Sequence, residues 1–135
     1  MTEKNYIDKL AWINIKDRKI LSTRSKNNDT YYIPGGKRDG EESDQEALMR
    51  EIKEELSIDL VLKKIEYVGT FEAQAHGKPA GTMVRMTCYK SDFAGEIKAD
   101  NEIDEIVWLN HKGREKSSPV DKIILDWLKE KDLID

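Results

Sequence analysis

The stretch from Gly36 to Ile58, GKRDGEESDQEALMREIKEELSI, decides how this chain is interpreted. It contains Ser43 followed three residues later by Glu46, a capping box that predicts a helix beginning at about Asp44. Aliphatic side chains recur every four residues along that helix and form an apolar face; they are Leu48, Ile52 and Leu56. We therefore expect this face to pack on a sheet, while its neighbour looks into a cleft.

The neighbouring face carries three carboxylates, Glu51, Glu54 and Glu55, one helical turn or less apart. Like charges at this spacing destabilise a helix by a few tenths of a kcal/mol per pair. Glu54 and Glu55 also fall in the last turn, where the helix dipole disfavours anions. A divalent cation would turn this repulsion into coordination, because hard cations take oxygen ligands. The pattern therefore indicates a metal site.

The same segment resembles the Nudix box, G-x5-E-x7-R-E-U-x-E-E-x-G-U, in which U is an aliphatic residue. Every fixed position matches except the last glycine, which is Ser57 here. A glycine would end the helix in the left-handed conformation, and another residue loses about 1 kcal/mol by adopting it. The resemblance extends outward, since residues 32–36 are similar to the family's entry into the box and residues 102–109 to its downstream strand.

The resemblance implies one domain over residues 1–135 with the Nudix fold, an α/β/α sandwich in which a mixed β-sheet lies between helices. It also implies cleavage of a nucleoside diphosphate linked to another group, X, by attack of water on phosphorus. The implied cofactor is Mg²⁺ or Mn²⁺, which neutralises phosphate oxygens and lowers the pKa of bound water. The expected partner is a small nucleotide.

Carried over by position, the implied metal ligands are three carboxylates, one backbone carbonyl and one remote carboxylate: Glu51, Glu54, Glu55, Gly35 and Glu102. Glu54, Glu55, Glu51, Arg50 and Glu102 are the candidate catalytic residues. Arg50 is expected to orient a neighbouring glutamate, and Glu42 to brace the loop or hold a metal-bound water. Glu102 could bind metal or act as the general base; the alternatives that stay open for that role are Asp100, Asp104 and Glu105.

The expected substrate-binding residues are Arg24, which lies before the box, and the two glycines Gly35 and Gly36. The glycines let the backbone approach metal and phosphate closely, which a Cβ would hinder. Arg85 and Lys78 could extend the positive side of the cleft, although surface roles are favoured for both. Four further residues are expected in loops or in the core instead of in the site, namely His76, His111, Trp108 and Trp127.

Bulk properties limit the partners and the compartment. The net charge of −4 makes nucleic acid an improbable partner, since phosphate contacts require a basic excess. Cys88 is the single cysteine and is expected in the core, so no internal disulfide forms. The N-terminus has charges where a signal peptide needs an apolar run, and no stretch approaches a membrane span. A cytoplasmic protein is expected, and the turn at 76–81 could reach a partner in a homodimer.

Substrate choice lies outside the box. Compact size favours a nucleoside triphosphate, with a nucleotide sugar, ADP-ribose or a coenzyme A conjugate as alternatives. The proline typical of ADP-ribose pyrophosphatases is absent around Ala73, and Ser117 and Ser118 stand where MutT-type enzymes read a base. A Nudix module that binds nucleotides without turnover is a further alternative, although such modules usually lose one of the three glutamates. Removal of pyrophosphate from RNA would need a basic track.

The remaining elements follow from alternation and turn residues. Strands are predicted at 6–15 and 20–24, paired as a hairpin, and at 60–73 and 82–92, paired as a second hairpin. Another strand is predicted at 103–109. Ser118 and Pro119 predict a second helix to about residue 131; its inward-facing residues are expected to be Val120, Ile123, Ile124, Trp127 and Leu128.

Overall fold

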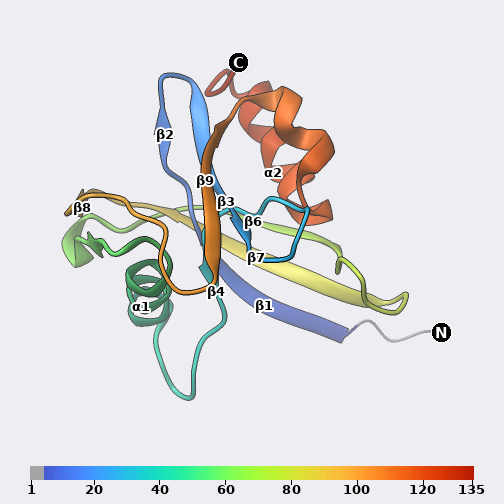
Figure 1. Cartoon of the computed structure of the whole chain (residues 1–135). Helices are drawn as coiled ribbons and strands as arrows, with labels where there is room; N and C mark the ends of the chain where they lie inside the picture. Colours follow the sequence, from blue (N-terminus) through green and yellow to red (C-terminus); the bar gives the residue numbers. More distant parts are fainter. Residues whose placement is uncertain (1–4) are drawn as a thin grey trace.

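The computed structural model describes residues 5–135. In chain order the elements are β1 (Asn5–Trp12), β2 (Ile15–Lys16), β3 (Lys19–Ser25), β4 (Gly35–Gly36), α1 (Asp44–Leu56), β5 (Asp59–Leu60), η1 (Leu62–Lys64), β6 (Glu66–Gln74), β7 (Thr82–Lys90), β8 (Phe93–Ala94), β9 (Ile103–Leu109), η2 (His111–Lys116) and α2 (Pro119–Glu130). Figure 1 shows α1 and α2 on opposite sides of the strands.

The central sheet is mixed and has the strand order β4-β1-β7-β6. Strand β1 runs parallel to β7, with Ala11 opposite Cys88, whereas β4 and β6 pair antiparallel with their neighbours. A second sheet has the order β2-β3-β9, and β5 pairs with β8. The parallel pairing of β1 with β7 places the N-terminal strand in the middle of the molecule.

Alternation along β1 divides the core into two layers. Leu10 and Trp12 pack with the buried face of α1, whereas Ala11 and Ile13 pack with the buried face of α2. Successive side chains of a strand point to opposite faces, so one strand serves both layers. A sheet covered by a helix on each face is the predicted α/β/α sandwich, which is confirmed.

The first predicted hairpin is wrong in part. The strand expected at 6–15 ends at Trp12, and it pairs with β7 and β4 instead of β3. Only the short β2 forms a hairpin with β3, with Ile15 opposite Ile20. Residues 10–13 are all buried, as expected for a strand that is covered on both faces in the middle of a sheet. Burial of the faces does not identify the strands that pair with the edges.

The strand expected at 60–73 is also wrong in part. It is divided into β5, the turn η1 and β6. Within the turn, the N–H of Lys64 donates to the carbonyl of Val61, and Leu62 is 58% exposed, so no sheet covers this stretch. The hairpin of β6 with β7 and the strand at 103–109 are confirmed.

The second helix begins at Pro119 as predicted. Ser118 has the extended backbone of an N-cap residue, but its side chain makes no capping hydrogen bond. Val120, Ile124 and Leu128 are buried, whereas Ile123 is 41% exposed, so its predicted inward orientation is wrong. In the described part of the chain, no helix combines the length and the apolar character that a membrane crossing needs.

Candidate functional site

Helix α1 is fixed at both ends by its own sequence. The predicted capping box is confirmed, because the N–H of Glu46 donates to Ser43 Oγ and the N–H of Ser43 donates to Glu46 Oε1, both at 3.1 Å. At the other end Ser57 has φ 60°, the left-handed conformation expected there, and its hydroxyl donates to Asp100 Oδ2 at 2.9 Å. The apolar face predicted for the helix is fully buried. This packing sets the direction in which the acidic face points.

Arg50 forms hydrogen bonds with three acidic side chains of the segment from Gly36 to Ile58. Its guanidinium donates two bonds of 2.9 Å to Glu42 and one of 2.9 Å to Glu51, with weaker bonds of 3.4 Å to Glu54. It also donates to the carbonyl of Lys37 at 3.0 Å, which ties the loop before α1 to the helix. The bidentate hydrogen bond from Arg50 lowers the pKa of Glu42. Glu42 therefore braces the loop, one of the two roles expected for it.

Glu55 differs from its neighbours because it lies deep beside Gly35. Burial, together with the charges of Glu51 and Glu54, raises the pKa of Glu55 to about 8, and a backbone hydrogen bond from Gly35 opposes the shift only in part. Its Oε2 atom is buried and has no hydrogen-bond partner. Burial also raises the pKa of Glu51. Two adjacent carboxylates thus resist ionisation together, and one buried oxygen needs a partner.

The two glycines predicted at the site are required by its geometry. Gly35 has φ 152°, and a Cβ there would overlap the carbonyl of Leu10. A Cβ on Gly36 would overlap the carboxylate of Glu51. The backbone of β4 therefore approaches β1 so closely at Gly35 that only glycine fits, whereas at Gly36 a Cβ would force the Glu51 carboxylate to move.

The glutamates of α1 have some, but not all, of the features of a divalent-cation site. The unpartnered oxygen of Glu55 and its closeness to Glu51 are what a hard cation would satisfy. Within residues 5–135, however, no three acidic, histidine or cysteine side chains converge as a preformed metal centre. The weak bonds of Arg50 to Glu54 have to be exchanged before that side chain can join the other two.

The acidic face opens into a cleft of about 230 Å³, whose lining includes Gly35, Gly36 and Glu55. A smaller cavity of about 80 Å³ adjoins it. The residues that line both are Lys9, Tyr32 and Met86. Sequence reasoning missed Lys9, although one signal was present: it stands at the same strand parity as apolar Ile7 and Ala11.

The loop of residues 95–102 lies against the end of α1. The N–H of Asp100 donates to the carbonyl of Glu55, and the N–H of Lys98 donates to the carbonyl of Leu56, each at 3.0 Å. Glu102 follows on this loop, and its carbonyl accepts a bond from Lys26. The contacts bring Glu102 to the side of the molecule that carries Glu55, where its role as ligand or base stays a prediction.

The alternatives to Glu102 are occupied by other contacts. Asp104 and Glu105 accept bonds from Arg24 at 2.8 and 3.1 Å. Asp100 accepts from Ser57. Arg24 itself is held away from the cleft lining, which includes its neighbours Thr23 and Ser25 on β3. Its predicted substrate role stays a prediction, and the structure gives its guanidinium other partners.

The remaining candidates have structural partners. Arg85 pairs with Glu72 at 2.9 Å, and His111 bonds with Asp126 at 2.7 Å. Cys88 is buried in the core as predicted. Four further facts concern side chains expected outside the site: the His76 ring bonds with Tyr32 at 3.0 Å, Lys78 lines the smaller cavity, Trp127 packs against the α2 layer, and Trp108 packs against the α1 layer.

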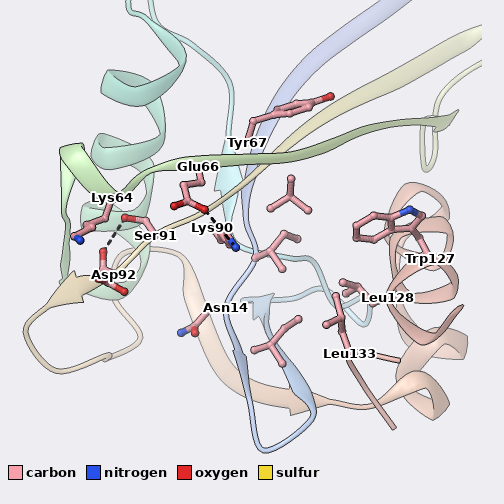
Figure 2. A pocket seen from close by; sticks show the side chains of 13 residues that line it. Asn14, Lys64, Glu66, Tyr67, Lys90, Ser91, Asp92, Trp127, Leu128 and Leu133 are labelled. Atoms are coloured by element: carbon pink, nitrogen blue, oxygen red, sulfur yellow. Dashed lines mark hydrogen bonds and ion pairs between the residues drawn. The ribbon is translucent and has the colours of Figure 1, made fainter. Parts of the chain in front are cut away.

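A larger cavity of about 720 Å³ shares no lining residue with the cleft. Figure 2 shows it between the strands and the end of α2, with Trp127, Leu128 and Leu133 on one side. Two of the charged side chains at its rim, Lys90 and Glu66, pair at 3.3 Å. This cavity therefore lacks the acidic cluster on which the chemistry depends.

Comparison with known proteins gives concordant results. A NUDIX domain model matches residues 10–128. An ADP-ribose pyrophosphatase of Methanocaldococcus jannaschii is 30% identical over 118 residues, which are 84% of this chain and 68% of the relative. The solution structure of the E. coli ORF135 protein is 26% identical, with a TM-score of 0.71 over 93% of this chain and 92% of that one. The crystal structure of a MutT protein from Methanosarcina mazei, 20% identical, shares the fold with a TM-score of 0.74 over 98% and 99% of the two chains.

Proposed function

The chain belongs to the Nudix family and is a Nudix hydrolase, and on that premise we propose that it is a metal-dependent pyrophosphohydrolase that cleaves a nucleoside diphosphate linked to X. A nucleoside triphosphate is the first candidate substrate. The observation that carries the proposal is Glu55, a partly buried side chain whose Oε2 atom is buried and unpartnered beside Glu51. A bound cation would stabilise that arrangement, and a polyanionic substrate needs such a cation.

Each residue of the site has a distinct task in this proposal. Glu51, Glu54 and Glu55, with the carbonyl of Gly35, would hold Mg²⁺ or Mn²⁺, which when bound supplies charge neutralisation of the phosphates. Arg50 holds Glu51 in place through a hydrogen bond of 2.9 Å. Its bond of 3.4 Å to Glu54 is weaker, so Glu54 could exchange it for a contact with the metal.

The other tasks concern the proton and the phosphates. Glu102, an exposed carboxylate on the loop docked at the end of α1, would accept the proton of the attacking water or complete the metal site. Gly36 would let a phosphate group approach the backbone on this side of the cleft, which it lines, and its missing Cβ leaves room for the Glu51 carboxylate.

ADP-ribose is the second candidate substrate, because the relative from Methanocaldococcus jannaschii bears the name of an ADP-ribose pyrophosphatase. The two candidates give different products. A nucleoside triphosphate yields a nucleoside monophosphate and pyrophosphate, or a nucleoside diphosphate and phosphate, whereas ADP-ribose yields AMP and ribose 5-phosphate. Mass identification of both products after hydrolysis in ¹⁸O-water therefore names the substrate class and the phosphorus attacked.

The test is a panel of nucleoside triphosphates, nucleotide sugars, ADP-ribose, coenzyme A and triphosphorylated RNA, incubated with Mg²⁺. Replacement of Glu54 by Gln should reduce kcat by at least about 100-fold, because a lost ligand weakens both the metal site and its charge stabilisation. The matched control is Glu41→Gln, an exposed glutamate in the preceding loop. Nucleotide binding without turnover across the whole panel would identify a non-catalytic module and overturn the proposal.

A further inference from the structure

Lys9 is a cation between two apolar residues on one face of β1. Ile7 and Ala11, which flank it on that face, pack with the layer beneath α2, as does Ile13 just after the strand. Burying an ammonium group costs free energy unless a partner satisfies it. Within residues 5–135 no hydrogen bond or ion pair engages the Lys9 ammonium, and only burial and more distant charges act on it. A lysine at this place therefore requires a reason outside the packing of the core.

The charged groups around Lys9 are of both signs, and none of those in the described residues forms an ion pair with its ammonium. Burial lowers the pKa of Lys9, and the nearby cations Lys37 and Lys78 lower it further, against the opposing effects of Asp121 and Glu55. The ammonium lies where the cleft with Glu55 meets the smaller cavity, since Lys9 lines both. An anionic group that entered the cleft would supply both the charge and the hydrogen-bond acceptors that this position lacks.

Arg24, the cation expected from the sequence to meet the substrate, has partners already. It donates to Asp104, Glu105 and the carbonyl of Asn28, and only its neighbours on β3 contribute to the cleft lining. Freeing it would break both ion pairs and leave Glu105 with the Tyr31 hydroxyl as its hydrogen-bond donor. Lys9 has no such partner, so it can bind an anion in the cleft without breaking an existing ion pair.

We propose that Lys9 binds the substrate, donating to a phosphate group at the junction of the two cavities. This inference rests on the proposed function, which it deepens by assigning the contact on the side opposite the acidic helix face. The substrate then lies between Glu55 on one side and Lys9 on the other, with its charge met from both directions.

Kinetics of Lys9→Met and Lys9→Arg test the assignment on the best substrate of the panel. Loss of a charge-assisted hydrogen bond should lower kcat/KM of Lys9→Met by about tenfold or more, chiefly through KM. Lys9→Arg keeps the charge and should recover most of the loss. The matched control is Lys63→Met, which removes an exposed lysine in η1. A value of kcat/KM for Lys9→Met equal to that of wild type, or an equal loss in Lys63→Met, would overturn the proposal.

A labelling experiment gives an independent readout on the wild-type protein. An amine-reactive succinimidyl ester is applied with EDTA present, with and without ATP or ADP-ribose, and modification is located by mass spectrometry. Either nucleotide should slow modification of Lys9 several-fold while Lys63 reacts at its former rate. If Lys9 only compensates for the charge of the buried Asp121, nucleotides would not protect it, and Lys9→Met would lose stability at an unchanged KM. That result would refute substrate binding by Lys9.

The two experiments also separate this inference from the function on which it rests. A wild-type protein that hydrolyses nothing in the panel counts against the proposed activity. Protection of Lys9 by a nucleotide in the same preparation would still support its place in the binding site, and absence of protection would count against it.

Discussion

Replacement of Glu55 by Gln should make the metal-free protein more stable at alkaline pH while abolishing its activity. The side chain keeps its shape and can still accept the backbone bond from Gly35, but it loses the charge that burial and Glu51 disfavour. Folded protein holds the Glu55 proton up to a pKa of about 8, whereas the unfolded chain releases it near the ordinary pKa of 4.5. The free energy of unfolding of wild type therefore falls as pH rises between these values, and then levels off.

The magnitude follows from the pKa of Glu55. One pKa unit corresponds to about 1.4 kcal/mol, so the displacement sets an upper limit of about 4 to 5 kcal/mol at pH 8 and above. Water access and rearrangement of Glu51 reduce this penalty, and we expect Glu55→Gln to gain about 2 kcal/mol there. At pH 4.5, where Glu55 is protonated in the folded protein and half protonated in the unfolded chain, the gain should shrink to about 0.4 kcal/mol.

Urea unfolding in EDTA at pH 4.5 and pH 8 measures this difference, with Glu130→Gln as the control for loss of an exposed helix carboxylate. Addition of Mg²⁺ at pH 8 should stabilise wild type, because a cation that binds only the folded state shifts the equilibrium. It should leave Glu55→Gln nearly unchanged. Equal stability of the two proteins at pH 8, or equal stabilisation of both by Mg²⁺, would refute the reasoning.

Three further outcomes are expected. Gly36→Ala should lower kcat/KM by about tenfold or more, since the new methyl group displaces the Glu51 carboxylate; steady-state kinetics beside a urea titration would show whether folding is spared. Arg50→Lys should lower kcat by about ten- to a hundredfold, because a lysine cannot reproduce the bidentate bond to Glu42, and an unchanged rate would contradict this. Ile52→Ala should lower the free energy of unfolding by about 2 to 5 kcal/mol, measured by urea unfolding, because Ile52 is fully buried beneath the site.

Local patterns in the sequence were sufficient for the helix that carries the site. The cap at Ser43, the buried stripe ending at Leu56 and the left-handed Ser57 all follow from residues three or four positions apart, whose interactions the helix itself fixes. Glycine at positions 35 and 36 was expected to admit metal and phosphate, which stays a prediction. The structure adds a reason that the sequence did not show, the contact of these residues with the Leu10 carbonyl and the Glu51 carboxylate.

Strand partners and the neighbours of single charged residues were beyond the reach of those patterns. Alternation predicted the strands, but the first strand was paired with β3. In the structure β1 lies between β4 and β7, and its partners on β7 are more than seventy residues away in sequence, as in the pair Asn5 and Thr82. Alternation reports which faces are buried and says nothing of which strand covers an edge. Helical periodicity likewise does not say how wide the buried stripe of a helix is. Ile123 was therefore placed inward, although it is 41% exposed on α2.

The sequence by itself determined the chemistry available to this protein: a helix with an acidic face, an arginine among the carboxylates and a glycine turn in front of them. Only the tertiary structure decided how that chemistry is tuned. It placed Glu55 beside Gly35, where burial raises its pKa. It also paired Arg24 with Asp104 and Glu105, whereas Lys9 lines the cleft. The physical reason is that helix geometry depends on near neighbours along the chain, whereas desolvation and charge pairing depend on contacts between distant segments.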